Sequence, residues 1–243
     1  MRIFTNRPKL NTMPVRGVGK AWATKLSTTS RVAPRYAYFS GASGNYVSTG
    51  DSSALRITGD LELRVRAAPN DYTPTAIQAL IAKDGVGPGT RSYVLYIDTD
   101  GTLVYGWSVL GTILITKSST SAVGVADGNI KWLRVVHDVD NGAVGNDVKF
   151  YTADDNTNYV QLGSTVTTAG TTSIAETSAI ATLGSAGAGV DNRFAGRIYE
   201  AEIYSGTTRV ASWDANLTVV GALQSVGRHG EIWTVSGEAY IGT

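Results

Sequence analysis

The alternating stretch from Leu61 to Ala67 constrains the fold of this chain most strongly. Apolar residues occupy every second position, and the charged residues Glu62, Arg64 and Arg66 stand between them. This period of two is typical of a β-strand with one buried face. We expect the charged side to be a solvated face or a contact between subunits.

Two later segments repeat the pattern as hairpins. Between Ser92 and Thr112, apolar residues alternate on both sides of the turn Asp98–Gly101. Between Ile130 and Thr152, they alternate around the loop 138–145. No window shows a helical apolar stripe. The sequence therefore predicts an all-β protein built as an antiparallel β-sandwich.

Length and composition favour one large domain with appendages. The chain has 243 residues, of which 28 are glycine and 42% are hydrophobic, and it has no internal linker run. We expect an extended arm over residues 1–35, a sandwich over 36–215 and C-terminal strands over 216–243 that pack on it. Alternation around Ser236 and Gly237 predicts a terminal hairpin. The absence of cysteine excludes disulfides and thiolate chemistry.

The charge is unevenly distributed. The net charge is +1, but eight basic residues precede the first acidic residue, Asp51. The rest of the chain holds 13 of the 21 basic residues and all 20 acidic ones, a formal balance of −7. We predict that the arm anchors the chain to an acidic protein partner; wrapping of the chain's own acidic body is the alternative. The basic residues of the arm are Arg2, Arg7, Lys9, Arg16, Lys20, Lys25, Arg31 and Arg35.

Several segments resemble those of a known fold family. They are the stretch Tyr36–Ala67, the two hairpins, Ile180–Gly184, and Phe194–Tyr204 with the sequence FAGRIYEAEIY. In this order they resemble the concanavalin A-like, laminin-G-like lectin and glucanase domains. The resemblance covers residues 37–213 and implies an antiparallel jelly-roll sandwich.

The C-terminal sequence GRHGEIWTVSGEAYIGT carries a narrower resemblance, to lectin-like minor tail proteins of tailed phages that infect actinobacteria. It implies a non-enzymatic virion protein, a minor tail or baseplate component that adheres to host surface glycans and is assembled in the host cytoplasm. The alternatives are a capsid decoration protein and, from another class, a polysaccharide-degrading enzyme. The implied partners are other virion subunits, host glycans and further copies of the chain, with no direct nucleic-acid or membrane contact. The start of the chain lacks the apolar core of a secretory signal.

Catalytic patterns are incomplete. Glycosidases of this fold carry three acidic residues on one strand, because alternate residues share a face. This chain has only Glu200 and Glu202, on a side expected to face solvent. His137 and Asp138 are neighbours on a strand, so their side chains point to opposite faces. We therefore expect no catalytic residues.

Binding sites are sought among aromatic residues with polar groups. Tyr46, Tyr72 and Tyr159 stand in loop-like contexts and are candidates for sugar binding. Trp107 is a further candidate, although its alternation with Tyr105 favours core packing.

Oxygen-bearing residues cluster in three loops, where they could hold the one calcium ion that related domains often contain. The same residues also suit turns, and this alternative is favoured. Apart from a structural calcium ion, no cofactor is expected. The calcium candidates are Asp98 and Asp100, then Asp138, Asp140 and Asn141, then Asp191 and Asn192.

Overall fold

The computed structural model describes residues 33–243. Seven of the eight cations of the predicted arm lie outside these residues, and Arg35 is the one within them. The described part folds as one compact unit. It contains strands β1 to β17 and three 3-10 turns at Ser53–Leu55, Gly187–Gly189 and Ala215–Leu217.

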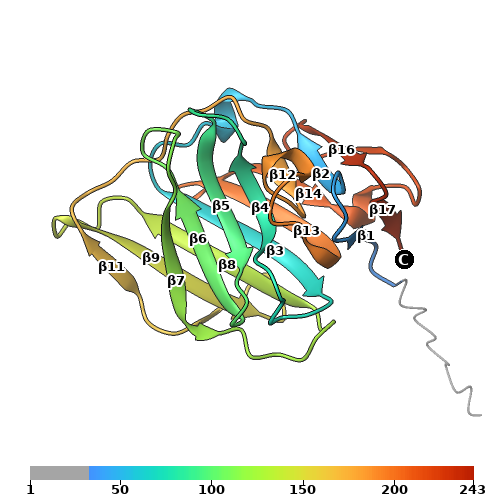
Figure 1. Ribbon diagram of the computed structural model, residues 1–243, viewed down its shortest axis with the longest axis horizontal. Helices are drawn as coiled ribbons and strands as arrows, with labels where there is room; N and C mark the ends of the chain where they lie inside the picture. Colours follow the sequence, from blue (N-terminus) through green and yellow to red (C-terminus); the bar gives the residue numbers. More distant parts are fainter. Residues whose placement is uncertain (1–32) are drawn as a thin grey trace, which may run out of the picture. The chain divides into compact units, whose positions relative to one another are not determined.

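The strands form two antiparallel sheets that lie face to face (Figure 1). Nine strands form sheet A: β1 (Tyr36–Ser40), β3 (Leu61–Pro69), β8 (Lys131–Asp138), β9 (Gly145–Ala153), β10 (Val160–Gln161), β11 (Val166–Ala169), β13 (Ala195–Ser205), β14 (Thr208–Asp214) and β17 (Tyr240–Gly242). Eight form sheet B: β2 (Tyr46–Thr49), β4 (Gln78–Asp84), β5 (Arg91–Ile97), β6 (Thr102–Trp107), β7 (Ile115–Ala122), β12 (Ala181–Leu183), β15 (Gln224–Val226) and β16 (Ile232–Ser236).

Strand order shows how the chain moves between the layers. Sheet A runs β10-β9-β8-β3-β13-β1-β17, with β11 also paired to β9 and β14 to β13. Sheet B runs β15-β16-β2-β12-β4-β5-β6-β7. The prediction of an all-β jelly-roll sandwich is confirmed.

The alternating stretch forms β3 at the centre of sheet A. Its apolar residues, such as Leu63 and Val65, are fully buried and join the main core. Sheet B contributes Tyr93 and Leu95 to the same core. A smaller cluster, which includes Val94, lies on the other face of sheet B. The apolar faces of the two sheets therefore pack against each other in one hydrophobic layer.

Both predicted hairpins are present. Strands β5 and β6 pair Tyr93 with Trp107 and Ile97 with Leu103 across the turn. Strands β8 and β9 pair over seven residues each, from Trp132 opposite Ala153 to Asp138 opposite Asp147. Local alternation and turn residues were sufficient to locate these strands.

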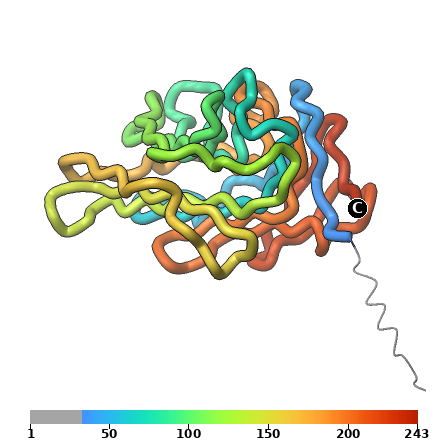
Figure 2. The backbone as a smooth tube through the Cα atoms, turned by 90° about the horizontal axis from the view of Figure 1, so that it is seen from below, coloured from blue at the N-terminus to red at the C-terminus, as the bar shows by residue number. Residues whose placement is uncertain are grey.

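The predicted terminal hairpin is wrong. β16 pairs with β2 in sheet B, whereas β17 pairs with β1 in sheet A, so the chain crosses between the layers at Gly237. Gly237 has φ 68°, and a Cβ there would lie 2.3 Å from Oδ1 of Asn45. The same oxygen accepts a hydrogen bond from the Glu238 backbone N–H at 2.7 Å. Asn45 therefore holds the crossing in place. Figure 2 shows the red C-terminal segment beside the blue β1–β2 segment.

Gly196, the glycine of the FAG sequence, lies where β13 passes close to β3. Its φ is 146°, and a Cβ there would lie 2.5 Å from the Ala68 carbonyl oxygen on β3. Only a residue without a side chain lets β13 pass this close to β3.

Candidate functional site on the outer face of sheet A

The sequence predicted that the charged side of β3 is a solvated face or a contact between subunits, but side chains of the same chain cover it. Glu62 and Glu202 are each only 7% exposed, although both point away from the core. In the register of the sheet, Arg64 lies between Arg134 of β8 and Glu202 of β13. Tyrosines and arginines cover these carboxylates and form a polar layer of their own.

Arginines and tyrosines stack on each other across this layer. The Arg64 guanidinium lies 4.5 Å from the ring centre of Tyr204 and 5.5 Å from that of Tyr159. The Arg134 guanidinium lies 4.8 Å from the ring centre of Tyr151 and 5.0 Å from that of Tyr159. Such cation–π contacts hold both partners in fixed orientations. We call these five residues the Tyr–Arg face.

The two buried carboxylates are fully used by this network. Glu62 accepts hydrogen bonds from Arg64 and from Arg134. Glu202 accepts from Arg209 at 2.6 Å, from the Tyr204 hydroxyl at 2.8 Å and from the Asn156 amide at 3.2 Å. Because every buried charge has a partner, the Tyr–Arg face is preorganised.

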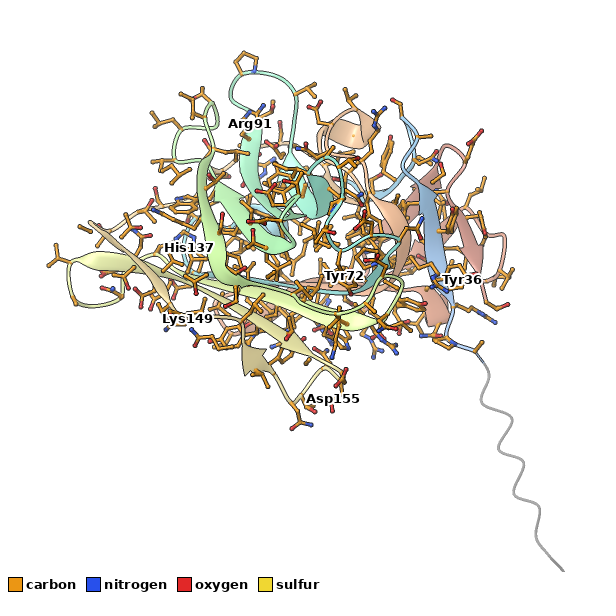
Figure 3. The ribbon with its side chains drawn as sticks, turned by 60° about the horizontal axis from the view of Figure 1, so that its bottom comes forward. Tyr36, Tyr72, Arg91, His137, Lys149 and Asp155 are labelled. Carbon is orange, nitrogen blue, oxygen red and sulfur yellow. The ribbon has the colours of Figure 1, made fainter. Side chains whose placement is uncertain are left out.

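The loop 154–159 closes one side of the Tyr–Arg face. The side-chain carbonyl of Asn156 accepts hydrogen bonds from the Tyr159 hydroxyl at 2.7 Å and from Arg64 at 3.3 Å. Asp155 accepts from the backbone N–H groups of Thr157 and Asn158, and these bonds hold the pKa of its carboxyl far below the usual range. Figure 3 shows Asp155 on a loop that projects beyond the strands. The loop therefore presents Tyr159 in one orientation.

A hollow of about 290 Å³ adjoins the Tyr–Arg face, at the end of β3 and β8. It shares Glu62 and Arg134 with the network described above. Its lining residues are Asp60, Leu61, Glu62, Arg134, Val136, His137, Asp138, Lys149, Gly206 and Thr207. Among them, Lys149 lies on the exposed side of β9, so the hollow offers both a cation and carboxylates to a polar ligand.

Glu200 and Glu202 share a face, as predicted, but their environments differ. Burial, together with the charge of Asp214, raises the pKa of Glu200 despite its ion pair with Arg66. Burial acts to raise the pKa of Glu202 as well, but hydrogen bonds outweigh it and lower that pKa overall. Separated pKa values suit a general acid and a nucleophile. Both oxygens of Glu202 already accept hydrogen bonds from the chain itself, however, and these bonds hold the carboxylate in the network.

The structure separates the four aromatic candidates for sugar binding. Tyr159 lies in the Tyr–Arg face. Tyr72 is 3% exposed and its hydroxyl donates to the Asn129 carbonyl, so its expected loop-like, accessible context is wrong. Trp107 is 1% exposed and stacks on Tyr105, in agreement with the core packing that its alternation favoured. Tyr46 is half-buried on β2, away from the others.

The predicted calcium ligands do not converge. One oxygen of Asp98 accepts from Thr99, and one of Asp100 accepts from Thr102. Asp138 and Asp140 likewise accept from backbone N–H groups two residues further on. These are turn-stabilising bonds, of the kind that the alternative interpretation of these residues expects. Within residues 33–243, no group of three or more His, Cys, Asp or Glu side chains is arranged to hold a metal.

A different carboxylate is short of partners. Asp84 at the end of β4 is 7% exposed, and its buried Oδ1 has no hydrogen-bond partner. Burial, with Asp191 nearby, raises the pKa of Asp84 to about 6 despite the ion pair of its Oδ2 with Arg91 at 3.4 Å. It lines a hollow of about 230 Å³ together with Gly187 and Ala188. Of the predicted calcium loops, only the one with Asp191 lies near this hollow.

Sequence reasoning missed most of the Tyr–Arg face. It named Tyr159 but not Arg134, Tyr151 or Tyr204. One signal was available, because β3 and β8 both carry arginine at outward positions, and Arg64 and Arg134 prove to be cross-strand partners.

In the part of the chain that the structure describes, no helix is long and apolar enough to cross a membrane.

Arg35 is the one predicted anchoring cation that the structure describes. Its guanidinium donates to the Thr218 carbonyl at 2.6 Å, and its backbone N–H donates to Asn216 Oδ1 at 3.0 Å. Arg35 therefore ties the start of β1 to the segment after β14.

Comparisons with known proteins agree on the fold. No protein-family model matches the sequence, and neither does any curated protein. A protein from Bacteroides ovatus that is described as a putative carbohydrate binding protein superimposes with a TM-score of 0.55 at 9% identity, over 86% of this chain and 60% of that one.

Two further structures are similar. The heptameric SAP-like pentraxin of Limulus polyphemus gives a TM-score of 0.49 at 13% identity, over 83% of this chain and 95% of that one. Domains LG4-5 of the mouse laminin alpha1 chain give a TM-score of 0.46 at 16% identity, over 70% of this chain and 40% of that one. This chain therefore spans about 60% of the length of the Bacteroides protein, and its described part is an antiparallel jelly-roll β-sandwich similar in fold to that protein.

Proposed function

We propose that this protein binds carbohydrate, without cleaving it, at the Tyr–Arg face and the adjoining hollow. The observation that carries the proposal is the set of three half-buried tyrosines held by Arg64 and Arg134. Sugar rings present apolar C–H faces to aromatic rings, and their hydroxyl groups pair with fixed polar side chains. The similar Bacteroides ovatus protein, which is described as carbohydrate-binding, supports the same class of ligand.

Local chemistry argues against hydrolysis at this site. A retaining glycosidase needs one carboxylate free to attack the sugar. Both oxygens of Glu202 accept hydrogen bonds, from Arg209, Tyr204 and Asn156. Glu200 pairs with Arg66 at 2.9 Å. Release of reducing sugars from a glycan that the protein binds would overturn this part of the proposal.

The test is a glycan array probed with the full-length chain. We expect binding to a defined subset of glycans, and we expect Tyr159→Ala to weaken it at least about tenfold, as for a central aromatic contact. Tyr240→Ala is the matched control, since Tyr240 is 49% exposed on the same sheet but packs against Tyr38. Absence of binding to every glycan, or equal losses in both variants, would overturn the proposal.

The finer role, as a phage minor tail or baseplate protein anchored by its N-terminal arm, remains our proposal on the sequence resemblance of residues 227–243. Capsid decoration is the alternative with the same fold. Electron microscopy of the particle decides between them: density at the tail tip supports adhesion to host glycans, whereas many copies on the capsid lattice support decoration.

We further propose that the hollow lined by Asp84, together with the neighbouring Asp191, holds a structural calcium ion; we call this place the Asp84 rim. The orphaned buried oxygen of Asp84 fits this role, because calcium binds carboxylate and carbonyl oxygens. Asp84 and Asp191 would provide the carboxylates, and the bound ion would neutralise a charge that burial disfavours.

A further inference from the structure

The edge of sheet B at β15 is open and apolar. Within residues 33–243, β15 pairs only with β16. The turn before β15 and the hairpin that it forms with β16 carry six large apolar side chains, each at least half exposed. We call them the apolar edge: Leu217, Val219, Val220, Leu223, Val226 and Ile232. Exposed edges of this kind promote pairing with another strand.

The hydrogen-bond register shows which backbone groups are available. The Val235 N–H donates to the Leu223 carbonyl and the Gly227 N–H to the Glu231 carbonyl, both at 2.8 Å. Bonds to β16 therefore come from the odd-numbered residues of β15. The N–H and C=O groups of Gln224 and Val226 point the other way, toward the open edge.

β15 is short, at three residues, but the protections that act through its side chains are absent here. Natural edge strands carry lysine, proline or inward charges that prevent pairing. The stretch Ala215–Gly227 contains no charged residue and no proline. By contrast, β7 at the other end of sheet B carries Lys117. A neutral edge can meet a copy of itself without repulsion between like charges, and this favours self-association over a charged partner.

We propose that two copies of this chain pair through β15, antiparallel and about a two-fold axis at Ser225. Gln224 of one copy then lies opposite Val226 of the partner subunit. Each of the two such pairs forms two backbone hydrogen bonds, because both residues present their N–H and C=O groups outward. Val226, which shares the outer face of sheet B with Ile232, then packs beside Gln224 of the partner subunit. Such a two-fold interface is self-complementary and closed.

Sedimentation velocity of the full-length chain over a range of concentrations tests this pairing. We expect a species of twice the chain mass of 25.6 kDa. Val226→Lys and Val226→Pro should each raise the dissociation constant at least about tenfold, because the first places a cation at the paired edge and the second removes an N–H that would bond to the partner strand. Val160→Lys is the matched control, since Val160 is 69% exposed on β10, in sheet A. A monomer at every concentration, or a dimer that survives both edge variants, would overturn the proposal.

Hydrogen exchange gives a second readout that does not depend on a substitution. The amides of Gln224 and Val226 should exchange fast at low protein concentration and slowly at high concentration. Those of Ser225 and Gly227 should be protected at both, because they bond to β16. Protection of Gln224 and Val226 that does not change with concentration would mean that another segment of the same chain covers the edge, which would also overturn the proposal.

Discussion

The guanidinium of Arg134 binds the carboxylate of Glu62 through two parallel hydrogen bonds, Nε to Oε1 and Nη2 to Oε2, both 2.8 Å long. This fork places Arg134 against the rings of Tyr151 and Tyr159. Only arginine makes such a planar, two-point contact while it stacks on an aromatic ring.

Arg134→Lys should therefore weaken glycan binding although it keeps the charge. We expect a loss of about tenfold in affinity on the strongest array glycan, measured by titration calorimetry. Arg193→Lys, at an exposed arginine on the rim near Asp191, should leave the affinity unchanged. Wild-type affinity in Arg134→Lys would show that the fork does not position the site.

Lys83 is a second buried cation, and its role is structural. It is 0% exposed, and its Nζ donates to Asp51 at 2.8 Å and to the carbonyls of Thr177 and Ala179 at 2.7 and 2.6 Å. Burial lowers the pKa of Lys83, and the charge of Asp51 opposes that effect. This one ammonium group joins β4 to two loops.

Lys83→Met should destabilise the protein by about 3 kcal/mol, because it leaves two carbonyls and a carboxylate without the ammonium group that they now bind. Urea unfolding measures this loss. Lys131→Met is the matched control: Lys131 pairs with Asp154, which is 86% exposed, and such a pair contributes less than about 1 kcal/mol. Equal losses in both variants would contradict the structural role assigned to Lys83.

Two buried groups give opposite dependences of stability on pH. His137 is fully buried, its Nδ1 lies 3.2 Å from the Tyr105 hydroxyl, and burial lowers its pKa from 6.5 to about 4, against the opposing effects of Asp60 and Asn146. The unfolded chain takes up the proton first, so stability is lost as the pH falls from about 6.5 to about 4, by about 3 kcal/mol.

Asp84 acts in the other direction. Its folded pKa of about 6 exceeds the ordinary 3.8, so stability is lost as the pH rises from about 3.8 to about 6, again by about 3 kcal/mol. In EDTA, which removes calcium, the opposite contributions of His137 and Asp84 to the unfolding free energy should nearly cancel in the wild type between about pH 4 and pH 6. Asp84→Asn should expose the His137 contribution as a fall in unfolding free energy on acidification. Parallel pH profiles for the two proteins would contradict the assignment.

Calcium should raise the melting temperature if the Asp84 rim binds it. At about 100 times the dissociation constant, one bound ion stabilises the folded state by about 2.7 kcal/mol. We expect this shift in the wild type, its reversal by EDTA and its loss in Asp84→Asn. Asp98→Asn and Asp140→Asn should keep the shift, because these carboxylates stabilise turns. A shift that survives in Asp84→Asn but vanishes in either control would place the ion elsewhere.

The sequence by itself was sufficient for the local elements. The alternation at Leu61–Ala67 and around the turn Asp98–Gly101 located β3, β5 and β6, because strand periodicity and turn chemistry are encoded in neighbouring residues. The resemblance of FAGRIYEAEIY covered β13, whereas the close approach of backbones at Gly196 appeared only in the structure.

Only the tertiary structure decided which strands share a sheet and which side chains meet. The segment Trp233–Ile241 alternates like a hairpin, yet its two strands belong to different sheets. The chain crosses between the sheets at Gly237, where the Glu238 backbone N–H donates to Asn45. Arg64, Arg134 and Tyr159 come from three separate segments, and no spacing links them. Their contacts arise because long-range pairing of β3 with β8, and the return of loop 154–159, depend on the whole core being assembled.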